Sequence, residues 1–446
     1  MHDPTETLDE QRQGYRGEAL QLLRKYGAKV GQRVRIETED GLETSGLLIP
    51  RYEHADSTHI VLKLKSGYNI GLSVNSIKSI SVLEDAQPTR AKEESETQPA
   101  AGKKRLLLLS TGGTIASRVD YRTGAVHPAL SADDLYSAVP ELNEVAQVKP
   151  EVVFSVYSEN ISPQDWQKLS ERIIDETGSD SADGIVVMIG TDTLAFVAAA
   201  LSFSLIGLKV PVVFVGAQRS SDRPSSDAAL NLLAAARFAV NSNSPGAYVA
   251  MHGSESDECV AIHHASRVRK DHTSRRDAFE SIDVPLVAQV RGAEILQVGE
   301  RIAPELPKEF QLRSKFSENV SLVKFYPGFD PEILDHLAKR NVRGIIIEGS
   351  GLGHVSSGTV KKISELARSG IFFGMCSQCI WGHVDMNVYD TGRDLLAAGV
   401  VSMENMISES ALVKLSWALG NFEDIRKVMT TNLVGEMTTR IPLSQA

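Results

Sequence analysis

The chain has 446 residues, of which 42% are hydrophobic and 23% charged. This composition is typical of a folded globular protein and excludes collagen-like and wholly disordered chains. At about 100–200 residues per domain, the length predicts two to four domains. Lysine and arginine number 47 against 57 acidic residues, so the net charge is 47 − 57 = −10. That sign argues against a chain that itself grips a long stretch of phosphate backbone.

The first residues and the cysteines favour a cytoplasmic location. Residues 1–6 lack the basic flank and apolar run of a signal peptide, and no stretch reaches about 18 uninterrupted apolar residues. Cys259, Cys376 and Cys379 cannot all pair internally, and so few thiols fit a reducing compartment. Cys376 and Cys379 have the spacing of a zinc pair, but no second pair of ligands follows, so we expect structural thiols and no metal.

Residues 1–84 predict a helix followed by a small β-barrel. Leu20, Leu22 and Leu23 indicate the helix, and apolar residues alternate with polar ones over 34–38 and 60–64, each time up to a glycine-containing turn. Such alternation predicts short antiparallel strands. Residues 85–104 contain mostly Pro, Gln, Glu, Lys, Ser and Ala, which predicts a flexible linker.

From residue 105 onward, nearly continuous apolar runs alternate with helical stretches, which predicts a parallel α/β sheet. Three of these runs lie at 106–109, 185–189 and 210–215. We expect a large domain at 105–300, a connector at 301–317 and a smaller α/β domain at 318–446. In the smaller domain the pattern predicts strands at 320–326, 344–348 and 371–375, and helices at 331–340, 359–369 and 409–420.

Two of the predicted strands end in turns that carry threonines, at Ser110–Ser117 and Gly190–Thr193. The first turn contains two glycines beside Thr114, so it is a candidate for carrying a nucleophile. It lacks the endings of a phosphate-binding loop or a dinucleotide fingerprint, so the remaining alternative is a purely structural turn. Taken alone, the second turn is better explained as a helix N-cap. Because the carboxyl ends of parallel strands meet at one edge, both turns together predict one crevice.

The turns TGGTIA, from Thr111, and GTDT, from Gly190, resemble the two signatures of the L-asparaginase type I/II amidohydrolases. The stretches 216–219, 225–232 and 269–273 agree with that family in order. The resemblance covers the chain from residue 105 to its end. It implies an asparaginase-like, two-domain, parallel-sheet core of the α/β class.

The resemblance also implies the catalytic groups. Thr114 would attack the side-chain amide carbonyl of the substrate, and Tyr121 would assist proton movement. Thr191, Asp192 and Lys270 would form the second catalytic group. This assignment is chemically coherent, because a threonine hydroxyl is a weak nucleophile at neutral pH and a desolvated lysine is one base that activates it.

Substrate contacts follow from the same resemblance. Ser158 matches the residue that holds the α-carboxylate, Asp192 faces the α-ammonium group, and Gly113 lets the backbone approach the ligand. Glu159 stands where the family often has an amide side chain, which leaves the choice between glutamine and asparagine open. The family completes its site with residues of a neighbouring subunit, so we expect a homodimer.

The barrel, the stretch GYNIG at 67–71 and the stretch TNLVGE at 431–436 resemble one branch of this family, the D subunits of archaeal-type glutamyl-tRNA(Gln) amidotransferases. This implies an ammonia-supplying glutaminase within a heterotetramer. A partner E subunit would hold Glu-tRNA(Gln) and activate its glutamate with ATP and Mg²⁺, while this chain itself would need no cofactor.

Two other functions stay open at this point. A free-standing asparaginase or glutaminase would use the same threonines without a partner. A non-catalytic adaptor would bind RNA through the barrel at residues 28–84.

His263 and His264 close a strand without a metalloprotease pattern, so we expect a surface or packing role for both.

Overall fold

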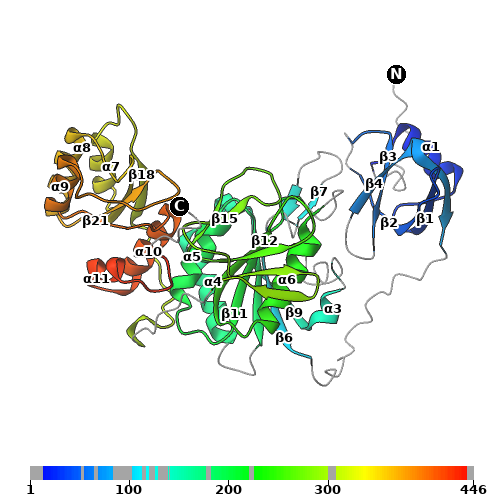
Figure 1. The fold of residues 1–446 in the computed structure, drawn as a ribbon, viewed down its shortest axis with the longest axis horizontal. Coiled ribbons are helices and arrows are strands. Elements are labelled where there is room, and N and C mark those ends of the chain that lie inside the picture. Colours follow the sequence, from blue (N-terminus) through cyan, green and yellow to red (C-terminus); the bar gives the residue numbers. More distant parts are fainter. Residues whose placement is uncertain are drawn as a thin grey trace.

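The computed structural model describes residues 14–51, 55–64, 69–83, 103–112, 117–119, 126–128, 139, 141–176, 182–219, 226–299 and 308–438, with the backbone alone for 117–119 and 126–128. Apart from Lys103 and Lys104, the linker predicted at 85–104 lies outside these ranges. Figure 1 shows an N-terminal unit, a large α/β unit and a small α/β unit arranged in a row. Within the described ranges, none of the helices has the length and apolar character to cross a membrane.

The N-terminal unit is a helix packed on a five-stranded antiparallel sheet, in line with the sequence pattern. In strand β1, Val34 and Ile36 are fully buried in one apolar cluster with Leu23 of the helix, whereas Arg33 and Arg35 are exposed. The strands pair in the order β4-β3-β2-β1-β5. The elements are α1 (Gly17–Lys25), β1 (Arg33–Thr38), β2 (Glu43–Leu48), β3 (His59–Lys63), β4 (Asn69–Ser73), the 3-10 helix η1 (Val74–Ser76) and β5 (Ile77–Val82).

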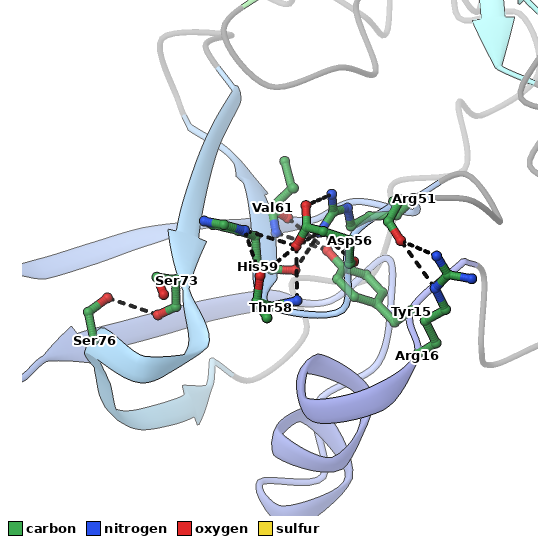
Figure 2. Close-up of polar contacts among 10 residues, drawn as sticks. Tyr15, Arg16, Arg51, Asp56, Thr58, His59, Val61, Ser73 and Ser76 are labelled. Atoms are coloured by element: carbon green, nitrogen blue, oxygen red, sulfur yellow. Dashed lines mark hydrogen bonds and ion pairs between the residues drawn. The ribbon is translucent and has the colours of Figure 1, made fainter.

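Polar contacts fasten the start of this unit to the segment between β2 and β3 (Figure 2). The Tyr15 hydroxyl donates to the carbonyl oxygen of Ile49 at 3.0 Å and accepts from the amide of Val61 at 3.0 Å. Burial raises the pKa of Tyr15 well above its usual range, so the phenol stays neutral. Arg51 and Asp56 form an ion pair at 2.8 Å beside it. These side chains fix the segment to the start of the unit.

The large unit is built on an eight-stranded sheet with the order β17-β16-β13-β12-β11-β10-β6-β9. Its parallel part consists of β6 (Arg105–Gly112), β9 (Gln147–Val156), β10 (Gly184–Met188), β11 (Pro211–Val215) and β12 (Gly246–His252). Its antiparallel part consists of β13 (Val260–His264), β16 (Ala288–Arg291) and β17 (Glu294–Gln297). Two separate hairpins pair β7 (Ser117–Val119) with β8 (Val126–Pro128), and β14 (Val268–Lys270) with β15 (Phe279–Ser281).

The antiparallel edge adds to the parallel sheet that the sequence predicts. Strands β12 and β13 are joined by the short segment 253–259. A parallel connection needs a crossover of a dozen or more residues, so a segment this short returns the chain as a hairpin. The sequence could have indicated this hairpin, because it contains no helical stretch between the two strands.

Both faces of the large sheet are covered by helices, which explains the continuous apolar runs. Leu107 and Leu109 of β6 pack into one cluster, and Leu106 and Leu108 into the cluster on the opposite face. Helices α4 (Pro163–Glu176) and α5 (Leu194–Ser204) contribute to the first cluster, and α3 (Leu142–Val145) and α6 (Ala228–Asn241) to the second.

The small unit has a four-stranded parallel sheet in the order β18-β19-β20-β21. Helices on one face share its apolar cluster, while helix α10 packs on the other face and against α5 of the large unit. The elements are η4 (Lys308–Phe310), β18 (Val320–Lys324), α7 (Glu332–Lys339), β19 (Gly344–Gly349), α8 (Ser357–Arg368), β20 (Phe372–Ser377), α9 (Asp390–Ala397), β21 (Val401–Ser402), α10 (Ser408–Asn421) and α11 (Ile425–Thr430). The two α/β units therefore share a core through α10 (Figure 1).

Candidate active site

The strand order of the large sheet places a crevice beside β6. The chain passes from β6 to β9 on one side of β6, and then from β10 to β11 and β12 on the other side. The connections that leave β6 and β10 therefore diverge, and ligands of open α/β sheets bind where such connections separate at the carboxyl ends of the strands. The two threonine turns follow these two strands.

The end of β6 is tied closely to its neighbours. The Thr111 hydroxyl donates to the carbonyl oxygen of Met188 at the end of β10, at 2.9 Å. Gly112 has φ +99°, and a Cβ atom there would lie 2.5 Å from the carbonyl oxygen of Val156. Only glycine fits this backbone, as expected for a turn that approaches another strand. The next residue, Gly113, and the predicted Thr114 and Tyr121 lie outside the described residues.

The turn after β10 brings three predicted residues into contact. Lys270 Nζ donates to Thr191 Oγ1 at 2.8 Å and to Asp192 Oδ1 at 2.6 Å. The side chain of Lys270 is 13% exposed and that of Asp192 is 72% exposed, so the carboxylate lies at the open side of the cluster. Lys270 reaches the turn from the end of β14, and the buried residues Val268 and Phe279 anchor that hairpin in the large core.

Thr193 of the second turn occupies the N-cap position of α5, as its sequence alone favours, but the side chain does not cap the helix. Its hydroxyl instead donates to the carbonyl oxygen of Ser158 at 2.8 Å. Ser158 is buried in the 3-10 helix η3 (Ser158–Asn160), and the neighbouring Glu159 is exposed. The turn thus fastens the predicted substrate-binding segment to the predicted catalytic group.

A third turn belongs to the same site, although the sequence analysis assigned it no role. Gln218 Oε1 lies 3.5 Å from Thr191 Oγ1, and Gln218 Nε2 is buried without a hydrogen-bond partner among the described residues. The Asp227 carboxylate accepts from the amides of Gln218 and Arg219, both at 3.0 Å. The sequence could have indicated this third turn, because GAQR at 216–219 directly follows a buried strand, as the other two turns do.

The hairpin that carries Lys270 also carries a shifted carboxyl group on its next residue. Burial first, and then the charges of Glu280 and Glu409, raise the pKa of Asp271 to about 6, while Arg269 opposes the shift. Arg269 Nε lies 3.6 Å from Asp271 Oδ1 and 3.5 Å from Glu409 Oε1. Asp271 therefore lies near two other carboxyl groups, those of Glu280 and Glu409.

Cys376 and Cys379 take no part in the contacts of the Thr191, Asp192 and Lys270 cluster. Cys376 is buried in β20, and burial raises the pKa of its thiol, so it stays protonated, whereas Cys379 is exposed in the following loop. In the part of the chain that the structure describes, no three His, Cys, Asp or Glu side chains gather as metal ligands.

Family models match most of the chain. "Asparaginase, N-terminal" matches residues 105–302, "Glutaminase/Asparaginase C-terminal domain" matches 319–431, and "GatD N-terminal domain" matches 28–83. The solved L-asparaginase of Thermococcus kodakarensis is 36% identical, with a TM-score of 0.66 over 75% of this chain and 100% of that chain. A Vibrio cholerae L-asparaginase I structure is 27% identical, with a TM-score of 0.65 over 75% of this chain and 99% of that chain. The fold and the family models define an asparaginase-like amidohydrolase.

Curated relatives extend this likeness to nearly the full length. The D subunit of the glutamyl-tRNA(Gln) amidotransferase of Thermofilum pendens is 45% identical over 96% of this chain and 97% of its own. The corresponding protein from Methanopyrus kandleri, which has the same name, is 46% identical over 95% of this chain and 94% of its own. The chain belongs to the family of glutamyl-tRNA(Gln) amidotransferase D subunits.

Proposed function

We propose that this chain is the glutaminase subunit of an amidotransferase that converts Glu-tRNA(Gln) to Gln-tRNA(Gln). It would hydrolyse the side-chain amide of glutamine and supply the ammonia to a partner subunit. The observation that carries the proposal is the cluster in which Lys270 Nζ lies 2.8 Å from Thr191 Oγ1 and 2.6 Å from Asp192 Oδ1. Full-length likeness to amidotransferase D subunits supports the same assignment.

In the proposed reaction, the Thr114 oxygen attacks the amide carbonyl carbon of glutamine, and Tyr121 assists the transfer of its proton to the leaving nitrogen. Ammonia leaves, and an ester joins Thr114 to the γ-carbonyl of the glutamyl group. Water then attacks this ester, which releases glutamate and restores the hydroxyl. Two smaller steps replace direct hydrolysis of a stable amide, which is the advantage of a covalent intermediate.

The Thr191–Asp192–Lys270 cluster would move the protons and hold the substrate. The hydrogen bond between Lys270 and Thr191 provides a path for a proton between an amine and a hydroxyl. The exposed Asp192 carboxylate offers an acceptor for the α-ammonium group. Ser158, Glu159 and the backbone of Gly113 complete the proposed substrate contacts.

The proposed assembly is a homodimer within a heterotetramer that contains two E subunits. Loops at the carboxyl edge of the small sheet expose large apolar side chains, as expected of a surface that a second copy covers. These residues are Tyr326, Leu352, Ile380, Trp381, Val388 and Tyr389. ATP and Mg²⁺ would act at the E subunit, which would also hold the tRNA, in keeping with the net charge of −10 on this chain. The complex would work in the cytoplasm and this chain would need no cofactor.

The test is ammonia release from glutamine and from asparagine by the full chain, alone and with the E subunit and Glu-tRNA(Gln). We expect low release from the chain alone and a marked rise only with both additions. Thr114→Ala and Lys270→Ala should each lower kcat for glutamine by about 10²–10⁴-fold or more, because each removes a group that acts in the transition state.

The matched control is Lys361→Ala, which removes an exposed lysine of α8 and should leave release unchanged. High release by the chain alone, unchanged by both additions, would establish a free-standing amidohydrolase instead. Full activity of Thr114→Ala would overturn the choice of nucleophile. A rise in KM for Lys270→Ala with kcat unchanged would make Lys270 a binding residue only.

A further inference from the structure

A series of side-chain hydrogen bonds leads from the third turn of the site to the loop of the Lys270 hairpin. Its members are Asp227 and Asn231 around the start of α6, His252 at the end of β12, Asp257 in the next loop, and Arg276 between β14 and β15. We propose that a doubly protonated His252 joins the two halves of this series and positions Lys270 against Thr191. The inference rests on the proposed function and adds positioning residues to it.

The inner half of the series holds the turn that follows β11. Asp227 is fully buried, and its carboxylate accepts from two backbone amides of the turn, those of Gln218 and Arg219. Asn231 Nδ2 donates to Asp227 Oδ2 at 2.9 Å and to the carbonyl oxygen of Gly216 at 3.0 Å. Because Gln218 approaches Thr191, this half sets one wall of the site.

The same contacts fix the orientation of the Asn231 amide. Both neighbours of its nitrogen, the Asp227 carboxylate and the Gly216 carbonyl, are acceptors, so the amide nitrogen must face them. Its oxygen then faces His252 Nδ1 at 2.6 Å. An amide oxygen only accepts, so His252 must carry a proton on Nδ1.

The outer half of the series requires a second proton on His252. Its Nε2 lies 3.2 Å from Asp257 Oδ1, and Arg276 Nη1 donates to the same oxygen at 2.7 Å. An ionised carboxylate is an acceptor only, so a hydrogen bond at Nε2 needs a proton there as well. With both nitrogens donating, His252 is an imidazolium between an amide and a carboxylate.

Burial by itself disfavours a charged imidazole, so the charged form of His252 depends on its two hydrogen-bond acceptors. Its side chain is fully buried, so it has no water contact to replace either hydrogen bond. The charged or titratable groups that face it or line the small cavity beside it come from α6, the loop after β12 and the hairpin: Asp227, Arg237, Asp257, Glu258, Cys259 and Arg276. The charges nearest to its Nε2 are those of Asp257, which attracts the proton, and Arg276, which shares that carboxylate.

The tether matters because the hairpin itself is short. Strands β14 and β15 pair over three residues each, and Lys270 is the last residue of β14. Arg276 holds the connecting loop through Asp257 and His252 to the body of the large unit. Loss of the Nε2 proton would free Asp257 and loosen the loop that follows Lys270.

The first measurement is a nitrogen-detected NMR spectrum of the full chain labelled with ¹⁵N-histidine. We expect one imidazole with protons on both nitrogens at neutral pH, and we expect its signals to disappear in His252→Gln. This readout does not depend on activity. A singly protonated His252 would overturn the proposal even if the chain proves to be a glutaminase.

The second measurement is kcat and KM for glutamine hydrolysis by the full chain with its partner subunit. His252→Gln and the more exposed Asp257→Asn should each lower kcat by about tenfold or more and change KM by less than about twofold, because both residues act by positioning Lys270. Asp257→Asn also serves if His252→Gln fails to fold, because Asp257 lies at the surface end of the series.

The matched control is Asp277→Asn, which removes a carboxylate of the same loop that binds Arg275 and stands outside the series. It should leave kcat unchanged. Wild-type kcat in both test variants would overturn the proposal, provided that Lys270→Ala is inactive. Full activity of Lys270→Ala would instead overturn the proposed function, and the two failures are thereby distinguished.

Discussion

His263 lies behind the Lys270 hairpin, where its Nδ1 is 2.8 Å from Ser281 Oγ and its Nε2 is buried without a partner among the described residues. Burial, aided by the neighbouring His264, lowers the pKa of His263 to about 3. Of the surface or packing role expected from the sequence, the buried position agrees with packing. The histidine is neutral in the folded protein and becomes protonated on unfolding at mildly acidic pH.

This difference makes the protein sensitive to acid. Between pH 6.5 and about 3 the unfolded chain binds the extra proton, so the free energy of unfolding falls as the pH is lowered through that range. From pH 7 to pH 4.5, we expect the wild-type chain to lose about 2–3 kcal/mol more than His263→Gln does. Denaturant unfolding at both pH values measures the difference.

The matched control for that comparison is His336→Gln on α7, which should keep the pH dependence of the wild-type chain. If His263→Gln and the wild-type chain lost the same free energy on acidification, the buried imidazole would not be the acid-sensitive group. Only the change with pH decides the result, because either substitution can alter stability at pH 7.

At the residue scale, the sequence predicted part of the candidate site for a physical reason. Thr191 and Asp192 follow a buried strand, so the strand pattern alone placed them at the binding edge. Lys270 was found by the family resemblance, because nothing local shows that its hairpin folds back onto that edge. The hydrogen-bonded series through Asn231 and His252 was not predicted, since its members come from elements that meet only in the tertiary structure.

At the element scale, the turns that follow β10 and β11 are in close contact. A Cβ atom on Gly216 would lie 2.8 Å from Thr191 Cγ2 and 3.0 Å from the carbonyl oxygen of Ile189. Gly216→Ala must therefore displace the Thr191 turn and disturb its contact with Lys270. We expect kcat for glutamine to fall by about tenfold or more with a smaller change in KM.

Gly358→Ala provides the control for this substitution, because a Cβ atom on Gly358 in α8 meets nothing closer than 4.0 Å. It should retain full activity and a similar or higher melting temperature. Wild-type kcat in Gly216→Ala would mean that the turn tolerates displacement and that its contact with Lys270 is not essential.

Helix α10 shows where a correct secondary-structure prediction still misses the packing. The sequence placed a helix at 409–420, and the structure has it at Ser408–Asn421. Its serines suggest a solvated face, yet Ser410 donates to the carbonyl oxygen of Ser266 and Ser416 to that of Ser317. Both faces of the helix are buried because one packs on each α/β unit, and a single sequence does not show which segments supply those carbonyls.

At the scale of the whole molecule, the two α/β units are joined by buried charges. Lys414 of α10 and Glu436 form an ion pair whose side chains are both 0% exposed. Glu436 also accepts from the amides of Leu433 and Val434, and its carbonyl oxygen accepts from Arg267 of the large unit at 2.8 Å. The segment after α11 is thus fixed to both units at once.

Glu436→Gln should destabilise this junction strongly. The substitution leaves the Lys414 ammonium buried without its counter-charge, which costs about 3–5 kcal/mol when one partner of a buried pair is removed. Denaturant unfolding measures the loss, and Glu423→Gln in the exposed segment before α11 is the matched control. A loss no greater than that of the control would show that the pair contributes nothing beyond its neutral hydrogen bonds.

The position of Glu436 in the chain has a consequence for biosynthesis. Arg267 and Lys414 are both translated before Glu436. For a time the nascent chain therefore contains both cations but not the carbonyl and carboxylate of Glu436 that they later bind. The strands and helices of both units can form earlier, but the buried contacts of Glu436 with Lys414 and Arg267 cannot form until residue 436 has left the ribosome. A message that is cut or stalled just upstream of residue 436 would yield a polypeptide that contains every strand of the large sheet but lacks these contacts. Its junction between the two α/β units would be incomplete, and cellular proteases remove products of this kind.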